Sequence, residues 1–176
     1  MVTITKEGVR RAIWRRRHRP LSRYMGKKRS LTVRGRYDKI RNICEFVADG
    51  AQRAGFDKDA VFQVQLACDE ACTNIIEHTY QEEDAGDITI SWEIKRGVFV
   101  VTIRDDGERF DPGDIPPAPI PPTPITTGED EDFDIKVGGL GVYFMRSLMD
   151  KVDFSFKEGN GNILRMEKQL PKESDS

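Results

Sequence analysis

Hydrophobic positions along the chain change their spacing several times, and each change predicts a different element. Residues 30–34 (SLTVR) alternate briefly and predict a short edge strand. Apolar residues then recur at helical spacing over residues 38–55, with Asp38 as the expected N-cap. A second helix with a broad apolar stripe is predicted over residues 60–78, and Asp57 is its expected N-cap.

After the second predicted helix the apolar positions alternate with period two, so residues 87–104 predict a β-hairpin. Residues 112–136 follow no such pattern and hold seven of the nine prolines. A glycine run at 138–141 then opens a short helix, and residues 152–168 predict a closing hairpin. Because strands and helices are grouped rather than alternating, this order favours an α+β fold, a two-layer sandwich with helices on one sheet face.

The length of 176 residues corresponds to one domain, or to one domain with a tail. The expected folded body is residues 30–170, flanked by an arm at 1–29 and a tail at 171–176. Residues 112–137 are expected to form either a mobile lid or a plain insertion, since long irregular segments are usually functional or disordered. No apolar run approaches the ~18 residues of a membrane span. The basic start lacks the apolar stretch of a secretory signal.

Charge is distributed unevenly, although the net charge is only −2. Residues 1–36 carry 13 Lys and Arg against one acid, Glu7, whereas the other 140 residues carry 15 against 29 acids. The basic arm has three open interpretations. It is a disordered solvated tail, a patch for an acidic partner such as nucleic acid or a membrane surface, or partly an artefact of start-codon choice, because Met25 precedes the first well-patterned segment.

Three cysteines without a CxxC pair fit a reducing compartment better than a disulfide framework, so a cytoplasmic location is expected. Cys68 and Cys72 stand four residues apart in the second predicted helix and share a face. This spacing favours buried packing over metal binding, since neither histidine stands at ligand spacing to them.

Three short motifs carry candidate chemistry. The first is Glu70-Ala-Cys-Thr-Asn74 on the second predicted helix, where a spacing of four places a carboxylate and a carboxamide on one face. Such a pair can hold a water, a hydroxyl or a hard cation, and a neutral Asn oxygen suits a Mg²⁺ ion that retains waters. The alternative is an ordinary solvated helix face.

The second motif, Asp105-Asp106-Gly107, ends a predicted strand. A carboxylate there can accept a hydrogen bond from an exocyclic amine, and the glycine lets the backbone approach a planar ring; a simple turn is the alternative. The third motif is Gly138-Gly139-Leu140-Gly141 at a helix start, where unsatisfied backbone amides and the helix dipole favour phosphate. Its alternative is a flexible loop end, and it is not a P-loop because no Gly-Lys-Ser/Thr follows.

The order of these motifs, with a long loop before the third, resembles the GHKL ATPase superfamily of histidine-kinase, gyrase and Hsp90 nucleotide-binding domains. The N box of that superfamily is similar to LACDEACTNIIEHTY, the G1 box to RDDGERFDP and the G2 box to GGLGVYFMRSLMDKVDF. More narrowly, the segments EACTNIIEH, FDP and GGLG…LMD resemble the anti-sigma-factor serine kinases of the RsbW type. The resemblance covers residues 30–170 and implies the Bergerat ATP-binding fold, with a mixed sheet.

The resemblance also implies roles for individual residues. Glu70 would be the general base that accepts a proton from a serine hydroxyl or water, and Asn74 would ligate Mg²⁺ on the phosphates of ATP. Asp105 would accept a hydrogen bond from the adenine amine, and Gly107 would let the backbone approach the ring. The amides that would contact the phosphates are those of Gly139, Leu140 and Gly141. One departure is Arg109, where the G1 box usually has Gly or Pro, and it bears on the lid hinge and on ATP affinity.

The implied function is an ATP-dependent serine/threonine kinase of a partner-switching pathway, acting as a homodimer. It would hold a sigma factor or similar regulator and phosphorylate a STAS-type antagonist, without direct nucleic-acid contact or a membrane span. Two alternatives stay open from the residues. One is a non-catalytic, nucleotide-dependent binding module that sequesters a regulator; Glu70 argues against it and Arg109 keeps it open. The other is a DNA- or membrane-associated protein that uses the basic arm.

Overall fold

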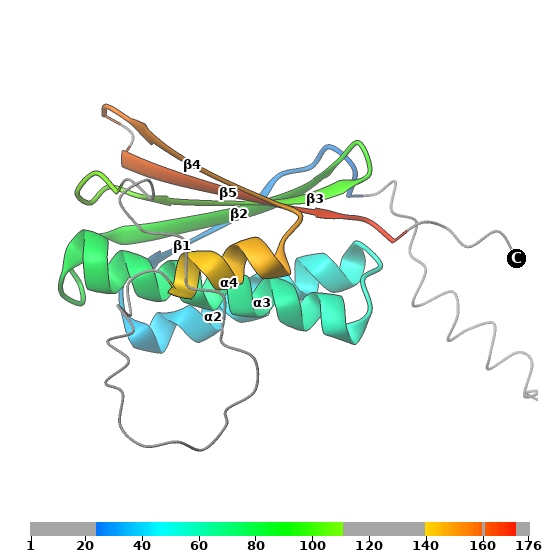
Figure 1. The fold of residues 1–176 in the computed structure, drawn as a ribbon, viewed down its shortest axis with the longest axis horizontal. Helices are drawn as coiled ribbons and strands as arrows, with labels where there is room; N and C mark the ends of the chain where they lie inside the picture. The colour runs from blue at the N-terminus through cyan, green and yellow to red at the C-terminus, as the bar shows by residue number, and fades with distance from the viewer. Residues whose placement is uncertain (1–23, 111–139, 160, 172–176) are drawn as a thin grey trace, which may run out of the picture.

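A computed structural model describes residues 24–110, 140–159 and 161–171 of the chain. The predicted lid (112–137), most of the predicted arm and nearly all of the predicted tail lie outside the described residues. The elements follow in this order (Figure 1): β1 (Arg29–Arg34), α2 (Tyr37–Arg53), α3 (Lys58–Asn74), a π-helical segment η2 (Ile75–Tyr80), β2 (Asp87–Lys95), β3 (Val98–Asp105), α4 (Leu140–Leu148), β4 (Lys151–Lys157) and β5 (Gly161–Gln169).

The described strands form one five-stranded sheet in the order β1-β2-β3-β5-β4. Helices α2 and α3 return the chain to the end of the sheet where β1 stops, so Arg34 pairs with Asp87 in antiparallel register. The other three pairings are antiparallel as well. The implied mixed sheet is therefore corrected to an antiparallel one. Among the described residues the only parallel pairing is an isolated bridge between Met25 and Ile94.

The three α-helices among the described residues, α2, α3 and α4, cover one face of the sheet, as the α+β sandwich prediction requires (Figure 1). Alternate residues of β2 and β3 point into the layer between sheet and helices, and large side chains there contribute about 1.5–3 kcal/mol each. These buried residues are Ile88, Ile90, Trp92, Ile94, Phe99, Val101 and Ile103. The predicted burial of Cys68 and Cys72 on the facing stripe of α3 is confirmed.

Two helix starts were predicted to be capped by aspartates, and one prediction is wrong. Asp57 caps α3, since its carboxylate accepts a hydrogen bond from the backbone N–H of Ala60 at 2.8 Å. Arg36 instead holds the cap position of α2, without a side-chain cap bond. Asp38 lies in the first turn, where ion pairs with Arg36 and Lys39 engage its carboxylate. An acid in that turn is also favoured by the helix dipole.

The second helix also ends differently from the prediction. The α-helix stops at Asn74, and η2 continues it as a wider π-helical segment to Tyr80. The wider turn keeps Ile75, Ile76 and Thr79 buried. Segments of this kind frequently lie at functional sites.

The C-terminal end of the predicted arm belongs to the folded body. Tyr24 is buried, with its ring centroid 6.3 Å from that of Trp92, and Arg53 donates a hydrogen bond to its hydroxyl at 2.6 Å. The N–H of Gly26 bonds to the carbonyl of Ile94 at 2.9 Å. The body therefore begins no later than Tyr24. Within the described ranges, no helix combines the length and the apolar character needed to cross a membrane.

Candidate functional site

Glu70 and Asn74 lie one turn apart on α3 and face the first turn of α4. A Cβ atom on Gly141 would come within 2.9 Å of Glu70 Oε2 and 2.8 Å of Asn74 Nδ2. A glycine at this position therefore lets α4 approach both polar side chains closely. The structure thus places Gly141 of the third motif beside the two polar residues of the first.

The carboxylate of Glu70 is only partly buried, so it can be reached from solvent. Burial raises the pKa of Glu70, and the negative charges of Asp69 and Glu77 raise it further. A raised pKa makes a carboxylate a stronger proton acceptor. Glu70 consequently has the electrostatic surroundings expected of a general base.

Asp105 ends β3 on the face that points toward the helices, because it continues the alternation of Phe99, Val101 and Ile103. Its side chain is buried, and Oδ1 accepts hydrogen bonds from the backbone N–H of Gly107 at 3.1 Å and from Asn162 Nδ2 at 2.8 Å. Burial raises the pKa of Asp105, while these two hydrogen bonds act in the opposite direction. The two bonds fix the orientation of the carboxylate.

Asn162 belongs to this site although no sequence motif marks it. Besides its bond to Asp105, its Nδ2 donates to the carbonyl of Glu108 at 2.7 Å, and its Oδ1 accepts from the N–H of Phe110 at 2.8 Å. Strand β5 thereby holds the loop that follows β3. The available signal was strand parity, since Asn162 shares a face with the buried Leu164 and Met166.

A pocket lies between α3, α4 and strands β3, β4 and β5. Its polar lining includes Asn74 and Asp105, so the first and second motifs share it. Its apolar walls are formed by Ala71, Ile75, Phe110, Met145, Phe154, Ile163 and Leu164. An apolar cleft with a few convergent polar groups is typical of a small-molecule site.

Gly107 has a packing role that the sequence did not indicate. A Cβ atom there would come within 2.4 Å of Thr79 Cγ2 and 3.0 Å of the Thr79 carbonyl oxygen. The glycine is therefore required for the close packing of the β3 loop against η2, whatever the ligand.

Only part of the third motif is described, whereas Arg109 lies within the described residues. Leu140 begins α4 and Gly141 lies buried in its first turn, whereas Gly139 is outside the described residues. The guanidinium of Arg109 lies over the Phe156 ring, 5.8 Å from its centroid. This cation–π contact links the loop after β3 to strand β4.

Comparisons with known proteins place this geometry in a family. The chain matches the histidine kinase-like ATPase domain over residues 33–168. A serine-protein kinase RsbW from Listeria monocytogenes serotype 4a (strain HCC23) is 32% identical over 129 residues, covering 72% of this chain and 80% of that protein. The protein of the same name from Halalkalibacterium halodurans is 29% identical, covering 81% of this chain and 83% of that protein. The one from Bacillus subtilis (strain 168) is 33% identical, covering 58% of this chain and 61% of that protein. The chain therefore belongs to the histidine kinase-like (GHKL) ATPase superfamily and resembles its RsbW-type members.

Proposed function

We propose that the protein is an ATP-dependent serine/threonine kinase of the anti-sigma-factor type that acts in partner switching. The observation that carries the proposal is the convergence of Glu70, Asn74 and Gly141 beside the pocket that Asp105 lines. A proton acceptor, a neutral oxygen donor and a base-binding pocket are the parts that phosphoryl transfer from a nucleotide requires. The shared name of the relatives, serine-protein kinase, supports the same reading.

The side chains that line the pocket support the binding of a purine base. The buried carboxylate of Asp105 can accept a hydrogen bond from an exocyclic amine, and the apolar walls can enclose a planar ring. The side-chain oxygen of Asn74 would hold Mg²⁺, an ion that offsets the negative charge of the transferring phosphoryl group when bound. Backbone amides of Gly139, Leu140 and Gly141 would donate to the phosphates, and the last two of these residues lie at the start of α4.

Glu70 is the residue proposed to move a proton. It accepts the proton of the acceptor serine hydroxyl as the hydroxyl oxygen bonds to the γ-phosphorus and ADP leaves. Its raised pKa suits this role, because a general base works best with a pKa near the operating pH.

The proposed partners are a sigma factor or similar regulator, which the protein holds inactive, and a STAS-type antagonist, which it phosphorylates. We propose a homodimer without direct contact to nucleic acid. A phosphoserine adds about −1.5 to −2 charges. Residues 37–176 carry 29 acids against 15 Lys and Arg, so the modified antagonist is repelled and the regulator is taken up again.

The test is phosphoryl transfer to STAS-domain proteins of the same organism, purified and incubated with the protein and MgATP. Phosphoserine on one of them, detected by mass spectrometry, is the expected result. Glu70→Gln should slow transfer by about two to four orders of magnitude while ATP affinity is retained. Glu45→Gln, an exposed change on α2, is the matched control and should behave as wild type. ATP binding without transfer to any candidate would favour a nucleotide-dependent binding module instead.

A further inference from the structure

The ring of Tyr80, the last residue of η2, lies where three loops converge. A Cβ atom on Gly35 or Gly86 would come within 2.8 Å or 2.5 Å of this ring, and one on Gly107 within 3.0 Å. These glycines stand after β1, before β2 and after β3. Because none of them carries a side chain, all three loops pack directly against the tyrosine.

The hydroxyl of Tyr80 connects two of these loops. It lies 2.7 Å from the carbonyl oxygen of Asp87 and 2.9 Å from Asp106 Oδ1, and these two acceptors share its single proton. Burial, and then the hydrogen bond with Asp106, raises the pKa of Tyr80, so the phenol keeps its proton. Asp106 is the residue between Asp105 and Gly107, and contact with it therefore acts on the turn that ends β3.

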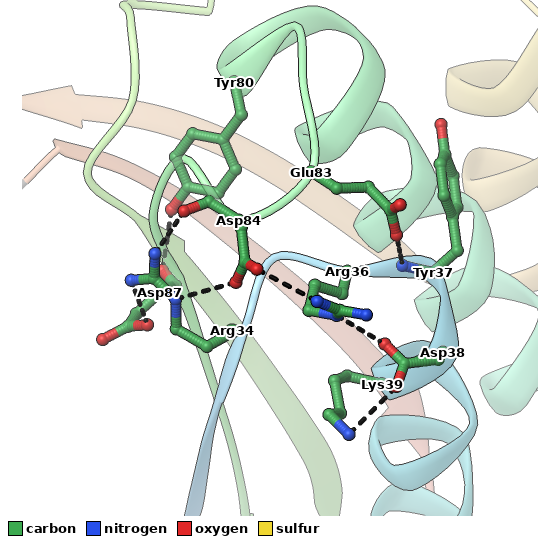
Figure 2. Close-up of polar contacts among 9 residues, drawn as sticks. All are labelled: Arg34, Arg36, Tyr37, Asp38, Lys39, Tyr80, Glu83, Asp84 and Asp87. Atoms are coloured by element: carbon green, nitrogen blue, oxygen red, sulfur yellow. Dashed lines mark hydrogen bonds and ion pairs between the residues drawn. The ribbon is translucent and has the colours of Figure 1, made fainter.

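Polar contacts also join the end of β1 and the residues after it to the loop before β2 (Figure 2). The N–H of Gly35 bonds to the carbonyl of Gly86 at 2.9 Å, and the N–H of Asp84 bonds to the carbonyl of Gly35 at 2.9 Å. Arg34 makes ion pairs with Asp84 at 3.2 Å and with Asp87 at 3.0 Å. These exposed ion pairs contribute little individually, so the two backbone bonds are the firmer link.

The turn that carries Asp105 is thus held from two sides. Asn162 bonds to the carboxylate of Asp105 from β5. Tyr80 bonds to the neighbouring Asp106 from η2. We propose that Tyr80 is a positioning residue for the nucleotide base: through Asp106 it holds the Asp105–Gly107 turn so that the Asp105 carboxylate meets the exocyclic amine of adenine. This inference rests on the proposed function and adds a determinant of base selectivity to it.

The experiment compares Tyr80→Phe with wild type by calorimetric titration with MgATP and with MgGTP. Loss of the hydroxyl is expected to raise the Kd for MgATP about fivefold, within the range of one hydrogen bond. The Kd for MgGTP should change little, because guanine carries an oxygen where adenine has its amine. Preference for ATP should therefore fall by the same factor, a change that a general loss of stability would not produce.

Tyr24→Phe is the matched control. It removes a tyrosine hydroxyl that accepts a hydrogen bond from Arg53 at 2.6 Å, far from the Asp105–Gly107 turn. Tyr24 packs against Trp92, which pairs with Val101, whereas Asp105 lies four residues further along β3, about 13 Å away along an extended strand. Both nucleotide affinities of this variant should match those of wild type.

A second pair of variants keeps the test decisive if Tyr80→Phe does not fold. Gly86→Ala would place a Cβ atom 2.5 Å from the Tyr80 ring and 2.6 Å from Asp106 Oδ1, whereas Gly50→Ala would place one 2.6 Å from Trp92 at the far end. Only the first should reduce ATP preference. If Tyr80→Phe folds and keeps the wild-type preference for MgATP over MgGTP, the role of Tyr80 is overturned and the proposed function stands. If only Gly86→Ala folds, the same result in that variant overturns the role of Tyr80. Wild type that binds no MgATP contradicts both.

Discussion

Asn162 Nδ2 donates a hydrogen bond to Asp105 Oδ1 at 2.8 Å, and both side chains are buried. The bond joins the second residue of β5 to the last residue of β3, and both residues line the pocket. It gives the carboxylate a fixed orientation in a place where an unpaired charge would be costly. The end of the pocket that we propose to bind the base is therefore held by a contact between strands and not by the G1 motif alone.

Replacing Asn162 by alanine should weaken both the fold and the site. The change removes three hydrogen bonds and leaves the N–H of Phe110 and an oxygen of Asp105 without this partner. We expect a loss of about 1–3 kcal/mol in the free energy of unfolding, measured by urea denaturation. The Kd for MgATP should rise about tenfold. Asn42→Ala, on the exposed side of α2, should change neither quantity.

Gly159, in the turn after β4, and Gly161, the first residue of β5, form a matched pair. Both have positive φ, +69° and +77°, so alanine is strained at either position. A Cβ atom at 161 would also meet the carbonyl oxygen of Asp105 at 1.9 Å, whereas the space beside 159 is open. Gly159→Ala should cost about 1 kcal/mol, and Gly161→Ala should cost well over twice that amount or prevent folding. Equal melting temperatures of the two variants would contradict this account of the turn.

Asp105 should make stability depend on pH in a specific direction. Its pKa is raised above the ordinary 3.8 in the folded protein, chiefly by burial, so the folded state holds the proton more tightly than the unfolded state. Its favourable contribution is complete below pH 3.8 and is lost as the pH rises through the folded pKa.

Asp105→Asn keeps an acceptor oxygen for Gly107 and Asn162 but carries no charge. We therefore expect this variant to be at least as stable as wild type at pH 7, with the advantage disappearing toward pH 3.8. Urea unfolding at both pH values measures this. A variant that is clearly less stable at pH 7 would show that the carboxylate stabilises the fold. The affinity of Asp105→Asn for MgATP should nevertheless be much lower than that of wild type.

Local sequence patterns were sufficient for most of the elements. The stripe over residues 60–78 and the two alternating hairpins correspond to α3 with η2, β2–β3 and β4–β5. These elements depend on neighbours within the same segment, which a pattern reports directly. The Asp57 cap depends on a backbone group only three residues away, so it too could be predicted from the sequence.

Contacts between distant segments could not be read in this way. The pairing of Asp105 with Asn162 depends on β5 inserting between β3 and β4, which no local pattern encodes. Asp38 follows the spacing of a cap, but the side chains of Arg36 and Lys39 engage it instead. Tyr80 stands at the end of a recognised motif, yet its role depends on glycines from three other segments.

Gly141→Ala should separate stability from function. Alanine favours a helix by about 1 kcal/mol over glycine, and the atoms it would crowd are the ends of the Glu70 and Asn74 side chains, which can move. The melting temperature should therefore stay near that of wild type. Phosphoryl transfer and MgATP affinity should both fall, because Glu70 and Asn74 are displaced. Wild-type kinetics in this variant would mean that α4 does not set their positions.

The most direct test of the central claim, that this pocket binds a magnesium nucleotide, is a calorimetric titration with ATP. It is done with and without Mg²⁺, on wild type and on Asn74→Ala. We predict micromolar binding by wild type that depends on Mg²⁺ and is lost in the variant. Absence of wild-type binding up to millimolar ATP, or equal binding by Asn74→Ala with and without Mg²⁺, would contradict the claim.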